Sequence, residues 1–168
     1  MPFAVKVYLD NNIVSAIAKD DSLSESDALD RLLKAMDEGK VQLVTSEVAR
    51  SEIEAYQDKL KRRLVERTYR LLTKVPIIRW DQLAGVNSYG DAHTWISTPI
   101  IQNDPDYEAL LGLSLETVDA QHVFVAVKQT CNVFLTCDRG VLHHGSAIKK
   151  RFGLTVEKPS HLVARQGW

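Results

Sequence analysis

Short apolar runs alternate with amphipathic segments along most of the chain, and this alternation predicts the order of its strands and helices. In the first run, residues 4–9, Val5, Val7 and Leu9 alternate before a polar Asp-Asn-Asn turn, which is typical of a buried strand. In residues 24–38 the apolar positions follow a helical spacing instead. By the same criteria we predict further strands at 41–44, 75–80, 132–136 and 154–156, and further helices at 13–18, 47–73, 106–113, 118–130 and 147–152.

Strands that alternate with helices predict an α/β fold. We expect a three-layer α/β/α arrangement with a central, mostly parallel sheet of four to five strands. The length of 168 residues fits a single domain spanning 1–168. Residues 81–103 show little periodicity and contain Gly85, Gly90 and Pro99. We therefore predict an insertion or long loop that, with the short helix after it, occupies 81–113.

Charge is distributed in blocks, although the whole chain is nearly neutral with a formal net charge of −1. Residues 58–80 hold eight basic and two acidic side chains, whereas residues 81–119 hold seven acidic and no Lys or Arg side chains. This pattern excludes a uniformly basic coat for nucleic acid, but it is compatible with a local basic surface.

Neither a membrane span nor a secretion signal is visible in the sequence. The longest aliphatic or aromatic run, 123–127, is far shorter than the roughly 20 residues that a membrane helix needs. The first residues lack the basic segment and long apolar segment of a signal peptide. The two cysteines, Cys131 and Cys137, bracket one predicted strand and would be held too far apart to form a disulfide. We therefore expect reduced thiols, a cytoplasmic location and no membrane association.

Four acidic residues lie where the carboxyl ends of the predicted strands would gather. Asp10 and Asp138 each follow a strand, and Asp119 begins the helix that leads into the fourth strand. Glu52 lies in the helix after the second strand. Ligands of parallel α/β sheets bind beyond this edge, and clustered carboxylates favour a hard cation such as Mg²⁺ or Mn²⁺. Taken singly, each acid also fits an ordinary role as a turn former, helix cap or solvated helix residue.

Four short motifs, in this order, resemble those of the PIN-domain family. The first strand ends in Asp10-Asn11-Asn12, which is similar to the family's Asp-x-Asn or Asp-x-Ser ending. Residues 46–52 resemble its Ser-(five residues)-Glu segment, with Glu52 in the acidic place. Asp119 heads an apolar helix, and 136–138 is similar to the Thr-x-Asp ending of the fourth strand. The resemblance covers nearly the whole chain, and only 81–113 is unlike compact members of the family.

This resemblance implies a metal-dependent endoribonuclease. It implies that one or two Mg²⁺ or Mn²⁺ ions are held by the acidic residues Asp10, Glu52, Asp119 and Asp138. Asn12 and Thr136 would orient these carboxylates or the bound water. Many small prokaryotic members are toxins of toxin–antitoxin pairs, so the resemblance also implies an RNA substrate, an antitoxin protein as partner and a homodimer.

The chain departs from the family after Asp138, where Arg139-Gly140 stand in place of a frequent second acidic or polar residue. The number of metal ions, one or two, is therefore left open. Glu116, three residues before Asp119, is either an extra ligand or an ordinary first-turn acid.

The predicted helix at 47–73 carries a dense cationic surface. An RNA nuclease needs such a surface, because acids at its centre repel phosphates. The alternatives are a solvated helix face and a dimer or partner interface. The candidate RNA-binding residues on this helix are Lys59, Arg62, Arg63, Arg67 and Arg70.

Two other functions compete with a nuclease. The first is a non-catalytic PIN-like module that binds RNA or protein, which would have no need to keep four mutually repelling acids. The second is a phosphoryl-transfer protein with Asp10 as acceptor, but such phosphatases use Asp-x-Asp and this chain has Asn12 in the second position. His122, on the same helix as Asp119, is interpreted either as a packed side chain or as a contact to RNA.

Overall fold

The computed structural model describes residues 5–10, 12–13, 23–46, 77–78, 86–89, 98–101 and 103–168. The strands within them are β1 (Val5–Leu9), β2 (Val41–Ser46), β3 (Ile77–Ile78), β4 (Val86–Tyr89), β5 (Thr98–Ile101), β6 (Val133–Leu135) and β7 (Thr155–Glu157). The helices are α2 (Leu23–Asp37), α5 (Pro105–Gly112), α6 (Thr117–Lys128), α7 (Arg139–His143), α8 (Gly145–Phe152) and α9 (Pro159–Gln166). The five predicted strands correspond to β1, β2, β3, β6 and β7.

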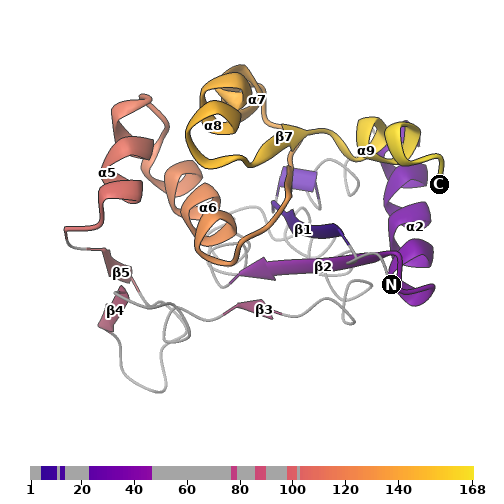
Figure 1. Cartoon of the computed structure of the whole chain (residues 1–168), viewed down its shortest axis with the longest axis horizontal. Coiled ribbons are helices and arrows are strands. Elements are labelled where there is room, and N and C mark those ends of the chain that lie inside the picture. Colours follow the sequence, from indigo (N-terminus) through magenta and orange to yellow (C-terminus); the bar gives the residue numbers. More distant parts are fainter. Residues whose placement is uncertain are drawn as a thin grey trace, which may run out of the picture.

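These five strands form one parallel sheet in the described part of the chain, in the order β3-β2-β1-β6-β7. β1 is central, because Tyr8 lies opposite Val44 of β2 on one side and Phe134 of β6 on the other. β3 and β7 extend the two edges, and both also pair in parallel. The predicted α/β fold with a parallel sheet is thus confirmed (Figure 1).

Helices cover both faces of the sheet. Val7 and Leu9 belong to a buried cluster with α2 and α9, whereas Tyr8 belongs to a second cluster with α5, α6 and α8. Figure 1 shows α2 and α9 side by side and α5 to α8 on the other side of β1. Successive residues of a strand point to opposite faces, so a strand buried on both faces is a nearly continuous apolar run in the sequence. The predicted three-layer arrangement follows from this burial.

Helix α9 is attached to α2 through a buried carboxylate. Glu25 is 6% exposed and accepts hydrogen bonds from the backbone N–H of Ser160, at 2.9 Å, and from its Oγ, at 2.7 Å. The N-cap position of α9, Lys158, makes no side-chain capping bond. Glu25 therefore satisfies an N-terminal N–H of α9 from a distant part of the chain.

The structure contains four short elements that were not predicted. Strands β4 and β5 form an antiparallel two-stranded ribbon inside the segment predicted to be an insertion or long loop. They were not predicted, because four-residue strands that contain Asn, Ser and Pro show no alternation of apolar positions. Helices α7 and α9 were not predicted. The predicted helix at 47–73 and nearly all of the one at 13–18 lie outside the described residues.

Two expectations drawn from the composition can be compared with the structure. Cys131 and Cys137 are both free thiols, as predicted. Burial raises the pKa of each thiol to about 11, so neither is a reactive thiolate near neutral pH. In the part of the chain that the structure describes, no helix is both long enough and apolar enough to cross a membrane.

Candidate active site

The strand order favours a ligand site at the carboxyl ends of β1 and β6. From β1 the chain proceeds to β2 and β3 on one side, and it later returns to β6 on the other side of β1. Ligands of parallel α/β sheets bind at such a reversal of strand order, beyond the carboxyl ends of the strands. Asp10 directly follows β1, and Thr136 and Asp138 follow β6. Three of the predicted site residues therefore meet at the position that the topology favours.

Asp10 is held in place from β6. Asp10 is 5% exposed, and its backbone N–H donates to the carbonyl oxygen of Leu135 at 3.0 Å. Thr136 Oγ1 donates to Asp10 Oδ2 at 2.7 Å and accepts from the backbone N–H of Asp138 at 3.0 Å. Thr136 is fully buried, and its hydroxyl connects the two acidic residues through these two hydrogen bonds. This geometry fits the orienting role predicted for Thr136.

Asp138 is the N-cap of α7 and uses one carboxylate oxygen for that purpose. Its Oδ1 accepts from the backbone N–H of Val141 at 3.1 Å. A Cβ atom at position 140 would lie 2.9 Å from the same Oδ1, so a larger residue there would require the Asp138 carboxylate to shift. The departure from the PIN-like pattern at Arg139-Gly140 thus has a local physical reason, because Gly140 leaves room for the Asp138 carboxylate. Asp138 can cap α7 and also act as a metal ligand, because the capping bond uses only Oδ1.

Asp119 lies in the first turn of α6, and the other acids affect the pKa of its carboxyl. Burial, followed by the negative charges of Asp10 and Asp138, raises the pKa of its carboxyl to about 6, against the opposing effect of His122. Glu116 adds a smaller effect in the same direction as the other acids. The charges of Asp10 and Asp138 therefore add to the effect of burial on this carboxyl. We call Asp10, Asp119 and Asp138 together the acidic edge.

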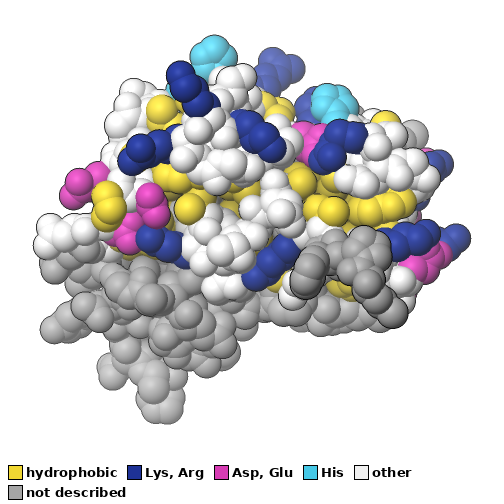
Figure 2. All heavy atoms as spheres, in the orientation of Figure 1, with side chains coloured by type: hydrophobic (Ala, Val, Ile, Leu, Met, Phe, Trp, Pro, Cys, Tyr) yellow, Lys and Arg dark blue, Asp and Glu magenta, His cyan; other side chains and the backbone are white. Residues whose placement is uncertain are grey.

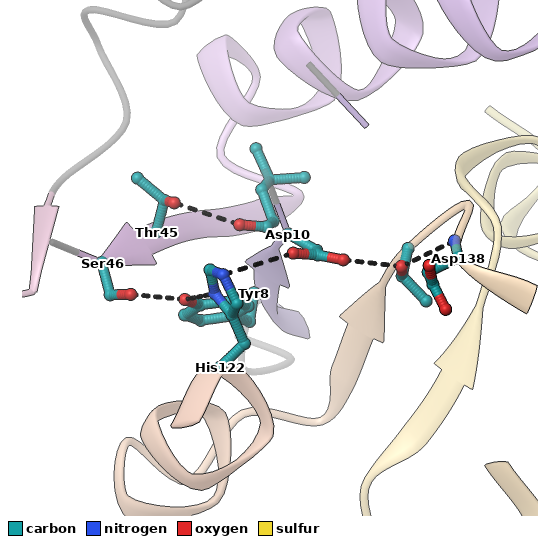
Figure 3. A network of polar contacts seen from close by, with 8 residues as sticks. Tyr8, Asp10, Thr45, Ser46, His122 and Asp138 are labelled. Atoms are coloured by element: carbon teal, nitrogen blue, oxygen red, sulfur yellow. Dashed lines mark hydrogen bonds and ion pairs between the residues drawn. The ribbon is translucent and has the colours of Figure 1, made fainter. Parts of the chain in front are cut away.

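A buried set of polar side chains borders the acidic edge. Tyr8 OH lies 2.5 Å from Ser46 Oγ and 2.7 Å from His122 Nδ1. His122 Nε2 lies 3.6 Å from Asp10 Oδ1 (Figure 3). His122 is 1% exposed, so in this structure its side chain is packed in the interior and does not form part of a surface for RNA. The three-residue spacing between Asp119 and His122, which places both on one helical face, is the sequence signal that could have associated His122 with the site.

The remaining predicted residues are either undescribed or unconnected to the acidic edge. Asn12 is partly buried, and its side chain makes no hydrogen bond to the acidic edge among the described residues. Its orienting role stays a prediction. Glu116 is exposed at the N-cap position of α6 and makes no side-chain capping bond. Other predicted site residues lie outside the described residues, namely Glu52 and the cationic Lys59, Arg62, Arg63, Arg67 and Arg70.

The donor atoms of the acidic edge are chemically suited to a hard cation. All are carboxylate oxygens, the ligands that Mg²⁺ and Mn²⁺ prefer, and the raised pKa of Asp119 marks a negative potential that a cation would relieve. Within the described residues, however, no group of three or more His, Cys, Asp or Glu side chains is arranged to hold a metal ion. The predicted ligand set also includes Glu52, which lies outside these residues.

Comparison with known proteins assigns no family to the chain. No model of a known protein family matches the sequence, and no curated protein matches it either.

Proposed function

We propose that the protein is a metal-dependent endoribonuclease of the PIN type that hydrolyses RNA phosphodiester bonds. The observation that carries this proposal is that Thr136 joins Asp10 and Asp138 at the carboxyl edge of a parallel sheet, where the charges of both acids add to burial in raising the pKa of the Asp119 carboxyl. A protein that only binds RNA gains nothing from three clustered carboxylates, because they repel phosphate. A nuclease needs them to hold a cation.

In this proposal each residue of the site has a specific task. Asp10, Asp119 and Asp138, with Glu52, would hold one or two Mg²⁺ or Mn²⁺ ions. When bound, such an ion supplies activation of the attacking water and neutralises charge on the phosphate and the leaving oxygen. Thr136 fixes the orientation of the Asp10 carboxylate through its 2.7 Å hydrogen bond. Gly140 leaves space for Oδ1 of Asp138, the oxygen that also accepts from the backbone N–H of Val141.

An RNA substrate also requires cations beside these acids. Arg139 directly follows Asp138, and Lys158 directly follows the last residue of β7, which neighbours β6 in the sheet. Among the described residues neither forms a salt bridge, whereas Lys128 and Arg165 do. Residues 120–168 hold seven basic and two acidic side chains, and Figure 2 shows Lys and Arg side chains spread over the surface where α7 to α9 lie. These positions support contacts to the phosphate backbone.

The biological setting is a further part of the proposal. Two free thiols fit a reducing cytoplasm. A toxin of a toxin–antitoxin pair, acting as a homodimer and silenced by an antitoxin protein, is the setting that the PIN-like motifs favour. A small neighbouring gene for a DNA-binding partner would support it, whereas its absence would favour a role in RNA processing.

The proposed activity is tested by incubating the purified protein with labelled structured and single-stranded RNAs in Mg²⁺ or Mn²⁺. We expect metal-dependent cleavage that EDTA abolishes and that falls at least about 100-fold in Asp10→Asn and Asp138→Asn, since each removes a charged ligand. Asp30→Asn, an exposed acid on α2, is the matched control and should cleave like the wild type. Equal cleavage by all four proteins would overturn the site, and binding of RNA without cleavage would favour the non-catalytic module.

A further inference from the structure

A buried chain of polar side chains leads from the end of β2 to the acidic edge, and the chemistry proposed above does not use it. Ser46, Tyr8 and His122, which we call the polar chain, are each no more than 1% exposed. They come from three different elements, β2, β1 and α6. Figure 3 shows their side chains in line, with the His122 ring between Tyr8 and Asp10. Buried polar groups of this kind are stable only when they are hydrogen bonded.

When the His122 ring is neutral, the carboxylate of Asp10 at one end sets the direction of these hydrogen bonds. As a carboxylate, Asp10 can only accept, so the ring nitrogen that faces its Oδ1 at 3.6 Å, His122 Nε2, carries a proton. In a neutral imidazole the other nitrogen, Nδ1, is then an acceptor. Tyr8 OH, 2.7 Å from Nδ1, must donate to it. Ser46 Oγ, 2.5 Å from Tyr8 OH, in turn donates to Tyr8.

We propose that His122 is a positioning residue, held by Tyr8 as the Nε2–H tautomer so that it directs this N–H at Oδ1 of Asp10. The contact of 3.6 Å is longer than a hydrogen bond, so it acts as an electrostatic restraint on the carboxylate. Thr136 restrains the other oxygen, Oδ2, at 2.7 Å. Asp10 is thereby held from two sides, by α6 and by β6. The orientation of a ligating carboxylate matters in this way only if the proposed nuclease function holds, on which this inference rests.

Tyr8→Phe is the variant that tests the polar chain with the least damage to the fold. The Tyr8 ring stacks on Phe134 at a centroid distance of 5.2 Å and an interplanar angle of 6°, and phenylalanine retains this contact. Only the hydroxyl is removed, which leaves His122 Nδ1 without its donor from Tyr8. Ser160→Ala is the matched control, because it also removes a hydroxyl hydrogen bond of 2.7 Å, to Glu25, far from His122 in the sequence and on the α9 side of the sheet.

The first readout is the tautomer of His122, measured in the metal-free protein by long-range ¹H–¹⁵N correlation of the imidazole rings. We expect the shifts of the Nε2–H tautomer in the wild type and in Ser160→Ala, and a mixture of tautomers in Tyr8→Phe. An Nδ1–H tautomer or an imidazolium in the wild type would overturn the proposal. An unchanged tautomer in Tyr8→Phe would overturn the part assigned to Tyr8.

The second readout is the rotamer of Asp10 in crystal structures of the metal-free variants. We expect one rotamer in the wild type and in His122→Gln, whose amide N–H can replace Nε2–H, and a changed or divided rotamer in His122→Leu. An unchanged single rotamer in His122→Leu would overturn the positioning role. Neither readout needs activity, so a wild type that cleaves no RNA would defeat the proposed function while these two results still decide the role of His122.

Discussion

Asp10, Asp119 and Asp138 occupy one edge of the sheet in three different environments. Asp10 is buried and hydrogen bonded to Thr136, and Asp138 caps α7. Asp119 lies partly exposed on α6, and its carboxyl has a pKa of about 6 because of burial and the charges of the other two. The repulsion between the acids therefore acts on a single residue, because the charges of Asp10 and Asp138 add to burial in raising the pKa of the Asp119 carboxyl.

The raised pKa of Asp119 predicts how stability depends on pH in the absence of metal. Between about pH 4 and pH 6 the folded state binds more protons than the unfolded state, so stability falls as pH rises through this window. Asp119→Asn removes the carboxyl group whose ionisation causes this loss of stability. We expect the variant to be more stable than the wild type at pH 7, on the order of 1 to 2 kcal/mol after allowance for partial exposure, and equal to it near pH 4.

Urea denaturation in EDTA at several pH values between 4 and 8 measures this difference. The exposed Asp30→Asn on α2 is the control and should follow the wild type at every pH. If the free energy of unfolding depended on pH in the same way in the wild type and in Asp119→Asn, the pKa of Asp119 would not be raised in the folded protein.

Some residues of the site could be predicted from the sequence and others could not, because some of their contacts join distant parts of the chain. The positions of Asp10, Asp119 and Asp138 at one edge follow from strand order, which the apolar runs reveal. Tyr8, in contrast, has the sequence pattern of an ordinary core residue, and its bonds to Ser46 and His122 span 38 and 114 residues. No local pattern carries such long-range hydrogen bonds, so the polar chain could not be predicted.

At the level of whole elements, the sequence predicts what is locally determined. The apolar runs of β1, β2 and β6 and the helical spacing of α2 and α6 predict these elements to within a few residues. Helix α9 was missed because its capping partner is not local. Its N-cap residue contributes no side-chain hydrogen bond, and Glu25, from α2, binds the N–H of Ser160 instead.

The attachment of α9 to α2 gives a prediction about that element alone. Glu25→Ala removes the acceptor of both Ser160 hydrogen bonds and leaves an N–H of α9 unsatisfied. We expect amide hydrogen exchange in α9 to become roughly tenfold faster, which is equivalent to about 1.4 kcal/mol, while α6 is unchanged. Glu108→Ala, an exposed acid on α5, is the control. Equal acceleration in α6 and α9 would mean that Glu25 supports the whole fold and not the attachment of α9.

At the level of the whole molecule, strand order and charge together define where the site lies. The strand order reverses at β1, and Asp10 and Asp138 follow the carboxyl ends of the neighbouring strands β1 and β6. Of the seven basic side chains in residues 120–168, Arg139 and Lys158 also lie at this end of the sheet, because Arg139 follows Asp138 and Lys158 follows β7. A nearly neutral chain can therefore combine an acidic cation site with a basic surface for phosphates. The assignment as a nuclease depends on whether the acidic edge does bind a cation.

Binding of Mn²⁺, measured by titration with electron paramagnetic resonance at pH 7.5, tests this central claim most directly. We expect the wild type and the exposed-acid control Asp30→Asn to bind Mn²⁺ with the same affinity. Asp10→Asn and Asp119→Asn should each bind at least about 10-fold more weakly, because each removes a charged oxygen ligand. An absence of Mn²⁺ binding by the wild type, or equal affinity in all four proteins, would contradict the account.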